Sequence, residues 1–369
     1  MDKLIIFAAH TKSLLNFRLP LARAYLSRGW EVVAVGPGDE SEWSARFAAH
    51  GIRFRSVPLD RNGLNPLSDW RLQRALLQLF REEQPRLLFC SQAKAVVYGV
   101  PAAAKAGVPG RYALISGLGS IFRGRGLKNA ILRAGLSWKY SRALKHAQRV
   151  FFQNTDDSGV FLERHLVSPE QVRWIPGSGV DTEKFQPLSL PEAPVFLLVA
   201  RLLKDKGVRE YLQAARELRQ KNPRCKFLLA GPFDTNPTSL TPEELKPYQE
   251  DGTVEYLGEL DDVRPAHARA SVFVLPSYHE GTPMSTLEAM SCGRAVITTD
   301  APGCRETVRP GENGLMVPPH DASALRDAME TLANSPGLRA SMGARSRQLA
   351  EEVFSAEKVT ALLVKEMMV

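Results

Sequence analysis

Short apolar runs alternate with amphipathic stretches along most of this 369-residue chain. In the first half, such runs occupy 4–8, 31–35, 53–57, 87–90, 111–115, 150–153 and 172–175. Each has four or five residues, is rich in Val, Ile, Leu and Phe, and lacks the period-2 alternation of a half-exposed strand. Strands covered on both faces have this pattern, so the runs predict a parallel sheet. Between two of them, the apolar residues of 69–83 recur at helical spacing and predict a helix.

A proline-rich segment at 186–194 divides the chain. It holds three prolines in nine residues, and the alternation then starts again with runs at 195–200, 226–230, 253–257, 271–275 and 295–298. The pattern predicts two doubly wound α/β domains facing a cleft, over 1–185 and 186–352, followed by a last helix over 353–369. Ligands of such domains bind at the carboxyl ends of the strands, so the segments that follow strands carry the candidate chemistry.

Composition sets wide limits. With 44% hydrophobic and 24% charged residues, the chain is neither disordered nor collagen-like. No apolar run reaches the roughly 18 residues of a membrane-spanning helix, and the N-terminus enters a strand-like run without a signal-peptide pattern. Four widely spaced cysteines predict free thiols in a reducing compartment. We therefore expect a cytoplasmic protein.

The net charge of +8 is unevenly distributed. Residues 1–190 carry 27 basic and 15 acidic residues, and 101–150 alone carry ten basic residues and no acidic one. Within 122–145, leucine, isoleucine and aromatic residues alternate with cations at helical spacing. This pattern predicts a basic amphipathic helix on an anionic membrane surface. A solvated helix packed on the core is the alternative; no nucleic-acid motif accompanies the segment, so no nucleic-acid partner is expected.

The run 195–200 leads directly to Arg201 and, five residues on, Lys206. A guanidinium can bind two phosphate oxygens at once and an ammonium adds a mobile point charge, so the pair is a candidate clamp for a diphosphate. The alternative is a loop whose basic side chains are merely solvated.

A second segment, 275–293, predicts a helix start after a strand. Thr282 is a good N-cap, Pro283 a good first helical residue, and Gly281 permits an unusual turn before them. The backbone N–H groups of Met284 and Ser285 would then be free to bind phosphate oxygens.

Two carboxylates flank this helix start. Glu280 lies on the loop before it and Glu288 in its second turn. A carboxylate accepts two hydrogen bonds from a vicinal diol, so each is a candidate to bind hydroxyl groups of one ligand. The alternative is that both are ordinary charges at a helix surface.

Together these features carry a resemblance. The spacing Glu280-x7-Glu288, the Arg201-x4-Lys206 pair and the segment 293–306 resemble the retaining glycosyltransferases of family 4, which have the GT-B fold of two Rossmann-like domains. The likeness covers essentially the whole chain. The segment 177–185 is similar to the family's Asn-Gly-Val-Asp-x-x-x-Phe stretch, with Ser178 where Asn is usual.

The resemblance implies roles for the donor site. Arg201 and Lys206 would hold the donor diphosphate and neutralise the leaving group, and Glu280 would bind the donor sugar; these three form the catalytic set. Glu288 would bind the ribose. The remaining donor-binding positions are the base-loop residues Gly258 and Val263 and the backbone of Gly281, Thr282, Pro283, Met284 and Ser285. No Asp-x-Asp signature follows a strand as a metal site requires, so no metal or other cofactor is expected.

The first strand–helix junction points to the acceptor. It lacks the paired glycines of many family members and resembles relatives that use a polyprenyl-diphosphate-linked sugar acceptor. Lys12, Asn16 and Arg18 are candidates to meet that anion, although a basic loop facing water is an equal alternative.

Two further segments after strands support the same subgroup. One contains Lys94, which can pair with a phosphate; the other contains Gly117 and Gly119, which allow a ligand to approach the backbone or simply turn the chain. His10 is a weaker candidate for the donor sugar, because a lone histidine near a strand end is more often structural. By the resemblance, the last helix crosses back to pack on the N-terminal domain.

These features predict a metal-independent retaining glycosyltransferase that is peripheral on the inner face of the cell membrane. It would move a hexose or N-acetylhexosamine, best guess N-acetylgalactosamine, from a UDP-sugar to an undecaprenyl-diphosphate-linked saccharide of a protein glycan, O-antigen or capsule. The rivals are a UDP-sugar 2-epimerase, which needs no membrane segment, and a sugar-nucleotide-binding subunit without catalysis. A nicotinamide oxidoreductase is disfavoured, since no Gly-x-Gly-x-x-Gly follows the first strand.

Overall fold

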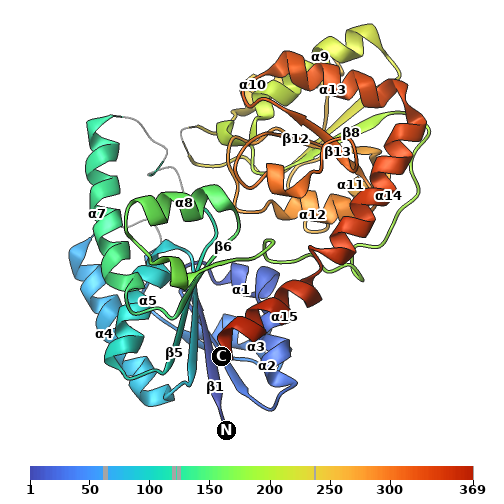
Figure 1. Ribbon diagram of the computed structural model, residues 1–369. Coiled ribbons are helices and arrows are strands. Elements are labelled where there is room, and N and C mark those ends of the chain that lie inside the picture. The colour runs from blue at the N-terminus through green and yellow to red at the C-terminus, as the bar shows by residue number, and fades with distance from the viewer. Residues whose placement is uncertain (61–64, 119–121, 123–125, 237, 369) are drawn as a thin grey trace. The chain divides into compact units, whose positions relative to one another are not determined.

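The computed structural model describes residues 1–60, 65–118, 122, 126–236 and 238–368 (Figure 1). The chain forms two compact units. Unit 1 contains Met1–Ser178 together with Val359–Val369, and unit 2 contains Gly179–Lys358. The chain therefore leaves unit 1 once and returns to it once.

Unit 1 is built on a seven-stranded parallel sheet in the order β3-β2-β1-β4-β5-β6-β7. Its strands are β1 (Lys3–Ala8), β2 (Glu31–Gly36), β3 (Arg53–Ser56), β4 (Leu87–Ser91), β5 (Gly110–Ile115), β6 (Arg149–Phe152) and β7 (Val172–Trp174). Its helices are α1 (Lys12–Phe17), α2 (Leu19–Leu26), α3 (Glu40–Ala48), α4 (Pro66–Glu83), α5 (Ala93–Lys105), α7 (Leu127–Leu144), α8 (Thr155–Glu163) and α15 (Ala356–Met367). Helices cover both faces of the sheet, as the unbroken apolar runs predict.

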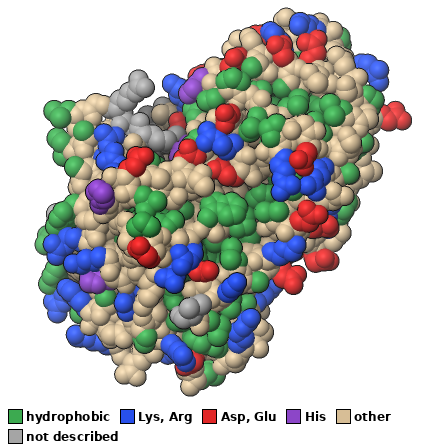
Figure 2. Space-filling model, in the orientation of Figure 1, with side chains coloured by type: hydrophobic (Ala, Val, Ile, Leu, Met, Phe, Trp, Pro, Cys, Tyr) green, Lys and Arg blue, Asp and Glu red, His purple; other side chains and the backbone are tan. Residues whose placement is uncertain are grey.

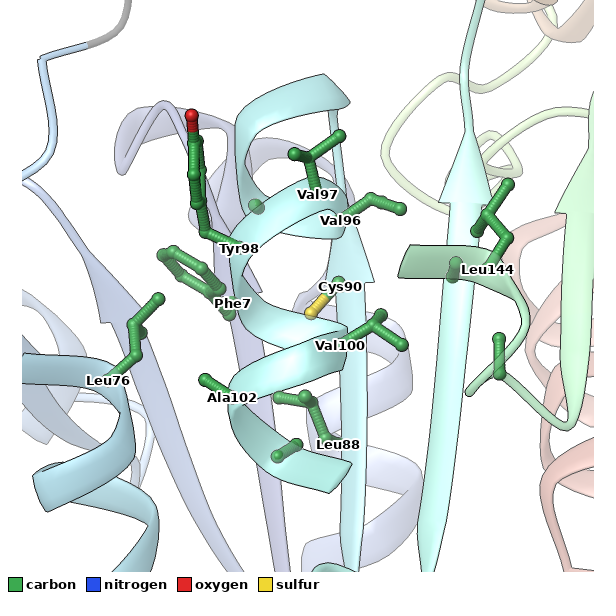
Figure 3. Packing of buried hydrophobic residues seen from close by; sticks show 14 of the residues in the cluster. Phe7, Leu76, Leu88, Cys90, Val96, Val97, Tyr98, Val100, Ala102 and Leu144 are labelled. Carbon is green, nitrogen blue, oxygen red and sulfur yellow. The ribbon is translucent and has the colours of Figure 1, made fainter. Parts of the chain in front are cut away.

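The central strand β1 shows why those runs do not alternate. Its residues Ile5 and Phe7 pack into one buried cluster, while Leu4 and Ile6 pack into another on the opposite face. On the first face, α5 lies directly against β1 and β4 (Figure 3). The approach is so close that a Cβ at Gly99 would lie 2.8 Å from the Cys90 sulfur and 2.8 Å from the Phe7 ring.

The second face carries the C-terminal helix α15. Its residues Val359, Leu363 and Met367 are buried in the same cluster as Leu4 of β1. The Tyr112 hydroxyl donates to the Met367 carbonyl at 2.8 Å. The predicted return of the last helix to the N-terminal domain is thus confirmed.

Unit 2 has a six-stranded parallel sheet in the order β10-β9-β8-β11-β12-β13. The strands are β8 (Val195–Val199), β9 (Lys226–Ala230), β10 (Glu255–Tyr256), β11 (Val272–Leu275), β12 (Ala295–Thr299) and β13 (Gly314–Val317). The helices are α9 (Val208–Lys221), α10 (Pro242–Glu250), α11 (Arg264–Arg269), α12 (Met284–Ser291), α13 (Ala322–Asn334) and α14 (Pro336–Glu352). The two doubly wound α/β domains that the sequence predicts are both present.

The first crossing falls at Ser178, ahead of the residue 185 expected from the proline-rich segment. The reason is packing: Val180 and Phe185 are buried against Leu287 of α12, so this stretch belongs to unit 2. The four cysteines are all buried free thiols. None of the described helices is long and apolar enough to cross a membrane.

Candidate active site

In unit 2 the chain order reverses between the neighbouring strands β8 and β11. Open α/β sheets bind ligands at such a reversal, outside the carboxyl ends of the strands. The loops that follow these two strands hold most of the sequence-predicted donor residues: Arg201 and Lys206 after β8, and Glu280 to Pro283 after β11.

The structure brings Lys206 and Glu280 together. The Lys206 Nζ forms an ion pair with Glu280 Oε1, and the two side chains are only 19% and 13% exposed. Hydrogen bonds between the neighbouring residues hold this pair in place. The Tyr278 N–H and the Ser277 hydroxyl each donate to the Asp205 carbonyl at 2.9 Å. These bonds join the loop after β8 to the loop after β11.

Two glycines allow this close approach. Gly207 has a φ of +68°, and a Cβ there would lie 2.1 Å from the Pro276 carbonyl oxygen. Gly303 follows β12 with a φ of +80°, and its Cβ would lie 2.2 Å from the Glu280 carbonyl oxygen. Only glycine fits either position, since both the backbone conformation and the space exclude a side chain. The Glu280 N–H also donates to the Pro302 carbonyl at 2.8 Å, which fixes Glu280 from behind.

Arg201 lies apart from that ion pair. Its guanidinium is 55% exposed and its Nη1 is 2.9 Å from Asp234 Oδ2. Arg201 is therefore an exposed cation paired with Asp234, an acidic residue after β9 that the sequence analysis did not single out. An ion pair this exposed contributes little to stability, so the guanidinium can be drawn to another anion at small cost.

Helix α12 begins one residue later than predicted. Pro283 has an extended ψ of 115° and is the N-cap, so Thr282 is not the capping residue and Pro283 is not the first helical one. The N–H groups of Thr286 and Leu287 both bond to the Pro283 carbonyl, at 3.1 and 3.2 Å. Helical turns begin with N–H groups that have no acceptor within the helix, and here these are the groups of Met284 and Ser285.

Glu288 has the most unusual environment of the carboxylates predicted for the donor site. It is half-buried on α12, and burial raises its pKa to about 7, opposed by the charge of Lys184 and assisted by that of Asp262. Asp262 belongs to the loop after β10 and is paired with Arg264 at 2.7 Å. The carboxyl group of Glu288 is thus poised between its neutral and charged forms at neutral pH.

The loop after β10 holds the other donor candidates, Gly258 and Val263. Gly258 has a φ of +73° with open space where a Cβ would be, and its carbonyl accepts from the Gly231 N–H at 2.8 Å. Val263 packs with Met284 on the cluster around Leu287. The predicted base loop and the predicted phosphate helix therefore share one hydrophobic support.

In unit 1 the corresponding reversal lies between β1 and β4. Lys12 and Asn16, on α1 after β1, are exposed. Arg18 is not: it is 6% exposed, burial lowers its pKa to about 10, and its guanidinium carbon lies 5.7 Å from the centre of the Phe89 ring. None of the described carboxylates pairs with Arg18. The first two candidates thus face solvent, whereas Arg18 is buried and its Nη1 donates to the Phe17 carbonyl at 3.2 Å.

Lys94 takes part in a network that joins three helices. Its Nζ lies 2.6 Å from the Asp60 carbonyl and 3.4 Å from Asp69 Oδ1. Asp69 of α4 also accepts hydrogen bonds from the Tyr98 hydroxyl of α5 and, at 3.2 Å, from the Lys139 Nζ of α7. Sequence reasoning missed Asp69, because nothing in the spacing along the chain indicates that three helices meet there.

The remaining acceptor candidates are less well placed. Gly117 is described, with a φ of +142° that favours glycine, whereas Gly119 lies outside the described residues. His10 is exposed, and its carbonyl accepts from the N–H and hydroxyl of Ser13 at 3.0 and 2.5 Å.

Helix α7 packs Tyr140 and Leu144 into the core but leaves three large apolar side chains exposed. Leu127, Ile131 and Trp138 are 79%, 64% and 60% exposed, and their spacing places them on one face. The neighbouring helix α4 adds Leu67 and Trp70, at 67% and 55%. Hydrophobic and basic side chains lie among one another along this edge of unit 1 (Figure 2). The sequence analysis did not single out Leu67 and Trp70, because they lie at the start of α4, before the buried residues that begin at Leu72.

Models of known protein families match both units of the chain. A model of the glycosyl transferase 4-like domain matches residues 17–177, and one of the glycosyl transferases group 1 matches residues 193–335. Together the two models cover most of both units.

Individual relatives and solved structures agree with these family models. The chain is 28% identical, over 93% of its length and 92% of the other protein, to the N,N'-diacetylbacillosaminyl-diphospho-undecaprenol alpha-1,3-N-acetylgalactosaminyltransferase of Campylobacter jejuni. It is 26% identical to the UDP-Gal:alpha-D-GlcNAc-diphosphoundecaprenol alpha-1,3-galactosyltransferase of Escherichia coli, over 75% and 74% of the two chains. The fold matches sucrose-phosphate synthase of Thermosynechococcus elongatus (TM-score 0.80, 19% identity, 99% and 98% covered) and the Anabaena protein HepE in complex with UDP (0.78, 18%, 99% and 99%).

Two doubly wound units with a returning C-terminal helix form the GT-B fold. The chain belongs to glycosyltransferase family 4, whose members retain the configuration of the sugar that they transfer. The prediction made from the motifs is thereby confirmed for the family, the fold and the class of enzyme.

Proposed function

We propose that this enzyme moves an N-acetylhexosamine or hexose, with N-acetylgalactosamine as the first choice, from a UDP-sugar to an undecaprenyl-diphosphate-linked saccharide in the assembly of a protein glycan, O-antigen or capsule. The observation that carries the proposal is the Lys206–Glu280 pair at the strand reversal of unit 2, beside the start of α12. Its geometry suits a sugar diphosphate, because a cation for phosphate and a carboxylate for hydroxyl groups meet at one point. The relatives named above support UDP and the lipid-linked acceptor.

The donor-site roles follow from chemistry. Lys206 and Arg201 would bind the diphosphate and neutralise the charge that grows on it as the bond to the sugar breaks, together with the N–H groups that open α12. Glu280 would accept hydrogen bonds from the sugar and Glu288 from the ribose. The acceptor hydroxyl attacks the anomeric carbon on the face that UDP leaves, and its proton passes to the departing phosphate oxygen. These residues need no metal for this step, and we propose that none is used.

For the acceptor we propose that Lys12 and Asn16 meet the diphosphate of the lipid carrier. Arg18 supports this assignment in a different way. A buried cation without a carboxylate partner is costly, so an anion bound near the α1–α2 junction would stabilise it. Lys94 is the weakest of the candidates, because Asp69 and the Asp60 carbonyl already occupy its ammonium group.

We also propose that α7 and the start of α4 rest on the anionic inner face of the cell membrane. The exposed Leu127, Ile131 and Trp138 would enter the interface, and nearby cations such as Arg142 would meet lipid phosphates. Each cation near such a surface contributes about 1 kcal/mol, so a few of them suffice for reversible attachment. The enzyme would then meet its lipid-linked acceptor while remaining cytoplasmic.

A transfer assay followed by mass spectrometry tests the proposal. Purified protein is mixed with a panel of UDP- and GDP-sugars and polyprenyl-diphosphate-linked sugars, with and without EDTA. We expect one lipid to gain one N-acetylhexosamine or hexose from a UDP-sugar, equally in both conditions. Conversion of the UDP-sugar without a lipid product would favour the epimerase, and UDP binding without any turnover would favour the non-catalytic subunit. A requirement for metal would contradict the proposed leaving-group chemistry.

A further inference from the structure

One residue of unit 1 has a backbone conformation that its side chain disfavours. Gln92 follows β4 directly and caps α5, with φ 74° and ψ 152°. This region is populated almost only by glycine, because a Cβ collides with the neighbouring backbone. Gln84, by comparison, has a φ of 44° and a ψ of 54°, the ordinary left-handed end of a helix. A residue kept in a strained conformation is a candidate for function.

The Gln92 amide is only half satisfied. Its Nε2 donates to the Ser13 hydroxyl at 3.2 Å, and Ser13 in turn donates to the His10 carbonyl at 2.5 Å. Its Oε1 is buried, yet within the described chain no donor reaches it. A buried oxygen without a donor loses the hydrogen bond that water would give, so the side chain gains from any ligand that supplies one.

The place of Gln92 in the fold points to the ligand. Ala8 at the end of β1 is in register with Ser91 at the end of β4, so the loop of Ser13 and the loop of Gln92 lie side by side. This is the strand reversal of unit 1, where open α/β sheets bind ligands. Lys12 and Asn16 belong to the same edge.

We infer that Gln92 is an acceptor-binding residue, whose amide oxygen accepts a hydrogen bond from a hydroxyl or acetamido N–H of the acceptor sugar. The inference rests on the proposed function. Because the residue as a whole is half-buried, its amide reaches a bound sugar by turning outward. That turn breaks the 3.2 Å hydrogen bond from Nε2 to the Ser13 hydroxyl, while Oε1 has no hydrogen bond within the described chain to lose.

A purely structural role makes different predictions. If Gln92 only joined the two loops through Ser13, then Ser13→Ala would harm the enzyme as much as loss of the Gln92 amide. If it contacts the acceptor, Ser13→Ala should be mild and the loss of the amide should raise the acceptor KM alone.

The test compares Gln92→Gly, Gln92→Ala and Ser13→Ala in the full-length enzyme, with the lipid-linked acceptor that the transfer assay identifies. Both Gln92 variants should raise the acceptor KM roughly tenfold, the loss of one hydrogen bond in a desolvated site, with kcat and the UDP-sugar KM little changed. Gln92→Gly should also melt about 2 °C or more above Gln92→Ala, because glycine removes the strain.

Each outcome decides. A normal acceptor KM in Gln92→Gly, with wild-type enzyme that transfers, would overturn the inference and leave the proposed function standing. Equal rises in the donor and acceptor KM would also overturn it, since the residue would then act through the fold. A wild-type protein that binds UDP and modifies no lipid-linked acceptor would instead refute the proposed function, and the acceptor role of Gln92 with it.

Discussion

The Lys206 ammonium and the Glu280 carboxylate neutralise each other across the loops after β8 and β11. Both groups are mostly buried, so neither is well solvated when the other is removed. A UDP-sugar offers a replacement for each partner, phosphate oxygens for Lys206 and sugar hydroxyls for Glu280. On the proposed assignment, donor binding exchanges one internal ion pair for two contacts with the ligand.

This exchange predicts that Glu280→Gln separates binding from catalysis. Without the carboxylate, Lys206 is free for phosphate, so the affinity for UDP should stay within a few-fold of wild type. The hydroxyl groups of the donor sugar lose the carboxylate that accepts their hydrogen bonds, and transfer should fall by roughly 10²–10³-fold. Calorimetry with UDP and initial rates of transfer would measure the two effects. Glu312→Gln, which alters an exposed ion pair of the same unit, is the matched control and should change neither.

The combined variant Arg201→Ala, Lys206→Ala tests the diphosphate clamp. Both cations are assigned to the diphosphate, which leaves the sugar during transfer, and not to the nucleoside. Affinity for the UDP-sugar should therefore fall by roughly 100-fold or more, at about 1.5 kcal/mol or more for each lost charge-assisted contact. The weak binding of UMP should hardly change. Equal losses for both ligands, measured by calorimetry, would show that the clamp is assigned to the wrong residues.

The pKa of Glu288 predicts a dependence of donor binding on pH. The ribose diol donates hydrogen bonds, so it favours the carboxylate over the neutral acid. Affinity for a UDP-sugar should fall as the pH drops below about 7, by up to tenfold per unit, because binding must first remove a proton. Glu288→Gln should bind more weakly at pH 8 and show no such slope. A wild-type affinity that is flat between pH 5.5 and 8 would contradict the ribose contact.

The pKa of Glu288 also predicts that the free energy of unfolding falls as the pH rises, whereas the affinity for the donor rises. The folded pKa of about 7 lies above the ordinary value of 4.5, so the folded chain holds a proton that the unfolded chain releases between these values. The stability of neutral Glu288 is complete below pH 4.5 and is lost as the pH rises through 7. Glu288→Gln stays neutral throughout, and its unfolding free energy should gain roughly 2–3 kcal/mol on wild type from pH 5 to pH 8. Thermal melts at both pH values would measure it.

The exposed tryptophans of unit 1 test the membrane proposal. Trp138→Ser combined with Trp70→Ser should reduce binding to vesicles containing anionic phospholipid by about tenfold or more, because both indoles lie on the proposed membrane face. Trp174→Ser removes a tryptophan that is 44% exposed on β7, outside that face, and should leave binding unchanged. Flotation of the three proteins with vesicles gives the comparison. If Trp174→Ser weakened binding as much as the double variant, the face would be wrongly assigned.

The fold was predictable because its signals are local. Unbroken apolar runs indicate strands buried on both faces, and Ile5 and Leu4 indeed pack on opposite sides of β1. The donor motifs were readable for the same reason, since Lys206 and Glu280 each follow a strand and neighbouring strands bring their ends together. The start of α12 was misjudged by one residue because the φ that proline imposes is compatible with the N-cap as well as with the first helical residue.

What the sequence could not give depends on contacts between distant segments. Arg18 looks like a basic loop residue, and only the packing of Phe89 against it reveals that it is buried. The pairing of Lys94 with Asp69 requires knowing that α4 and α5 meet. The strain at Gln92 leaves no trace in composition or spacing, because glutamine is not a residue that a pattern would place at a positive φ.

Unit 1 contains both the first and the last described segments of the chain, and unit 2 is continuous between them. In genetic terms, one continuous coding segment specifies unit 2, whereas two separate segments specify unit 1. A stop codon after Lys358 would remove Leu363 and Met367 from the hydrophobic layer that they complete. During synthesis, unit 2 leaves the ribosome whole while unit 1 still awaits α15. Unit 1, although translated first, is the last to be finished.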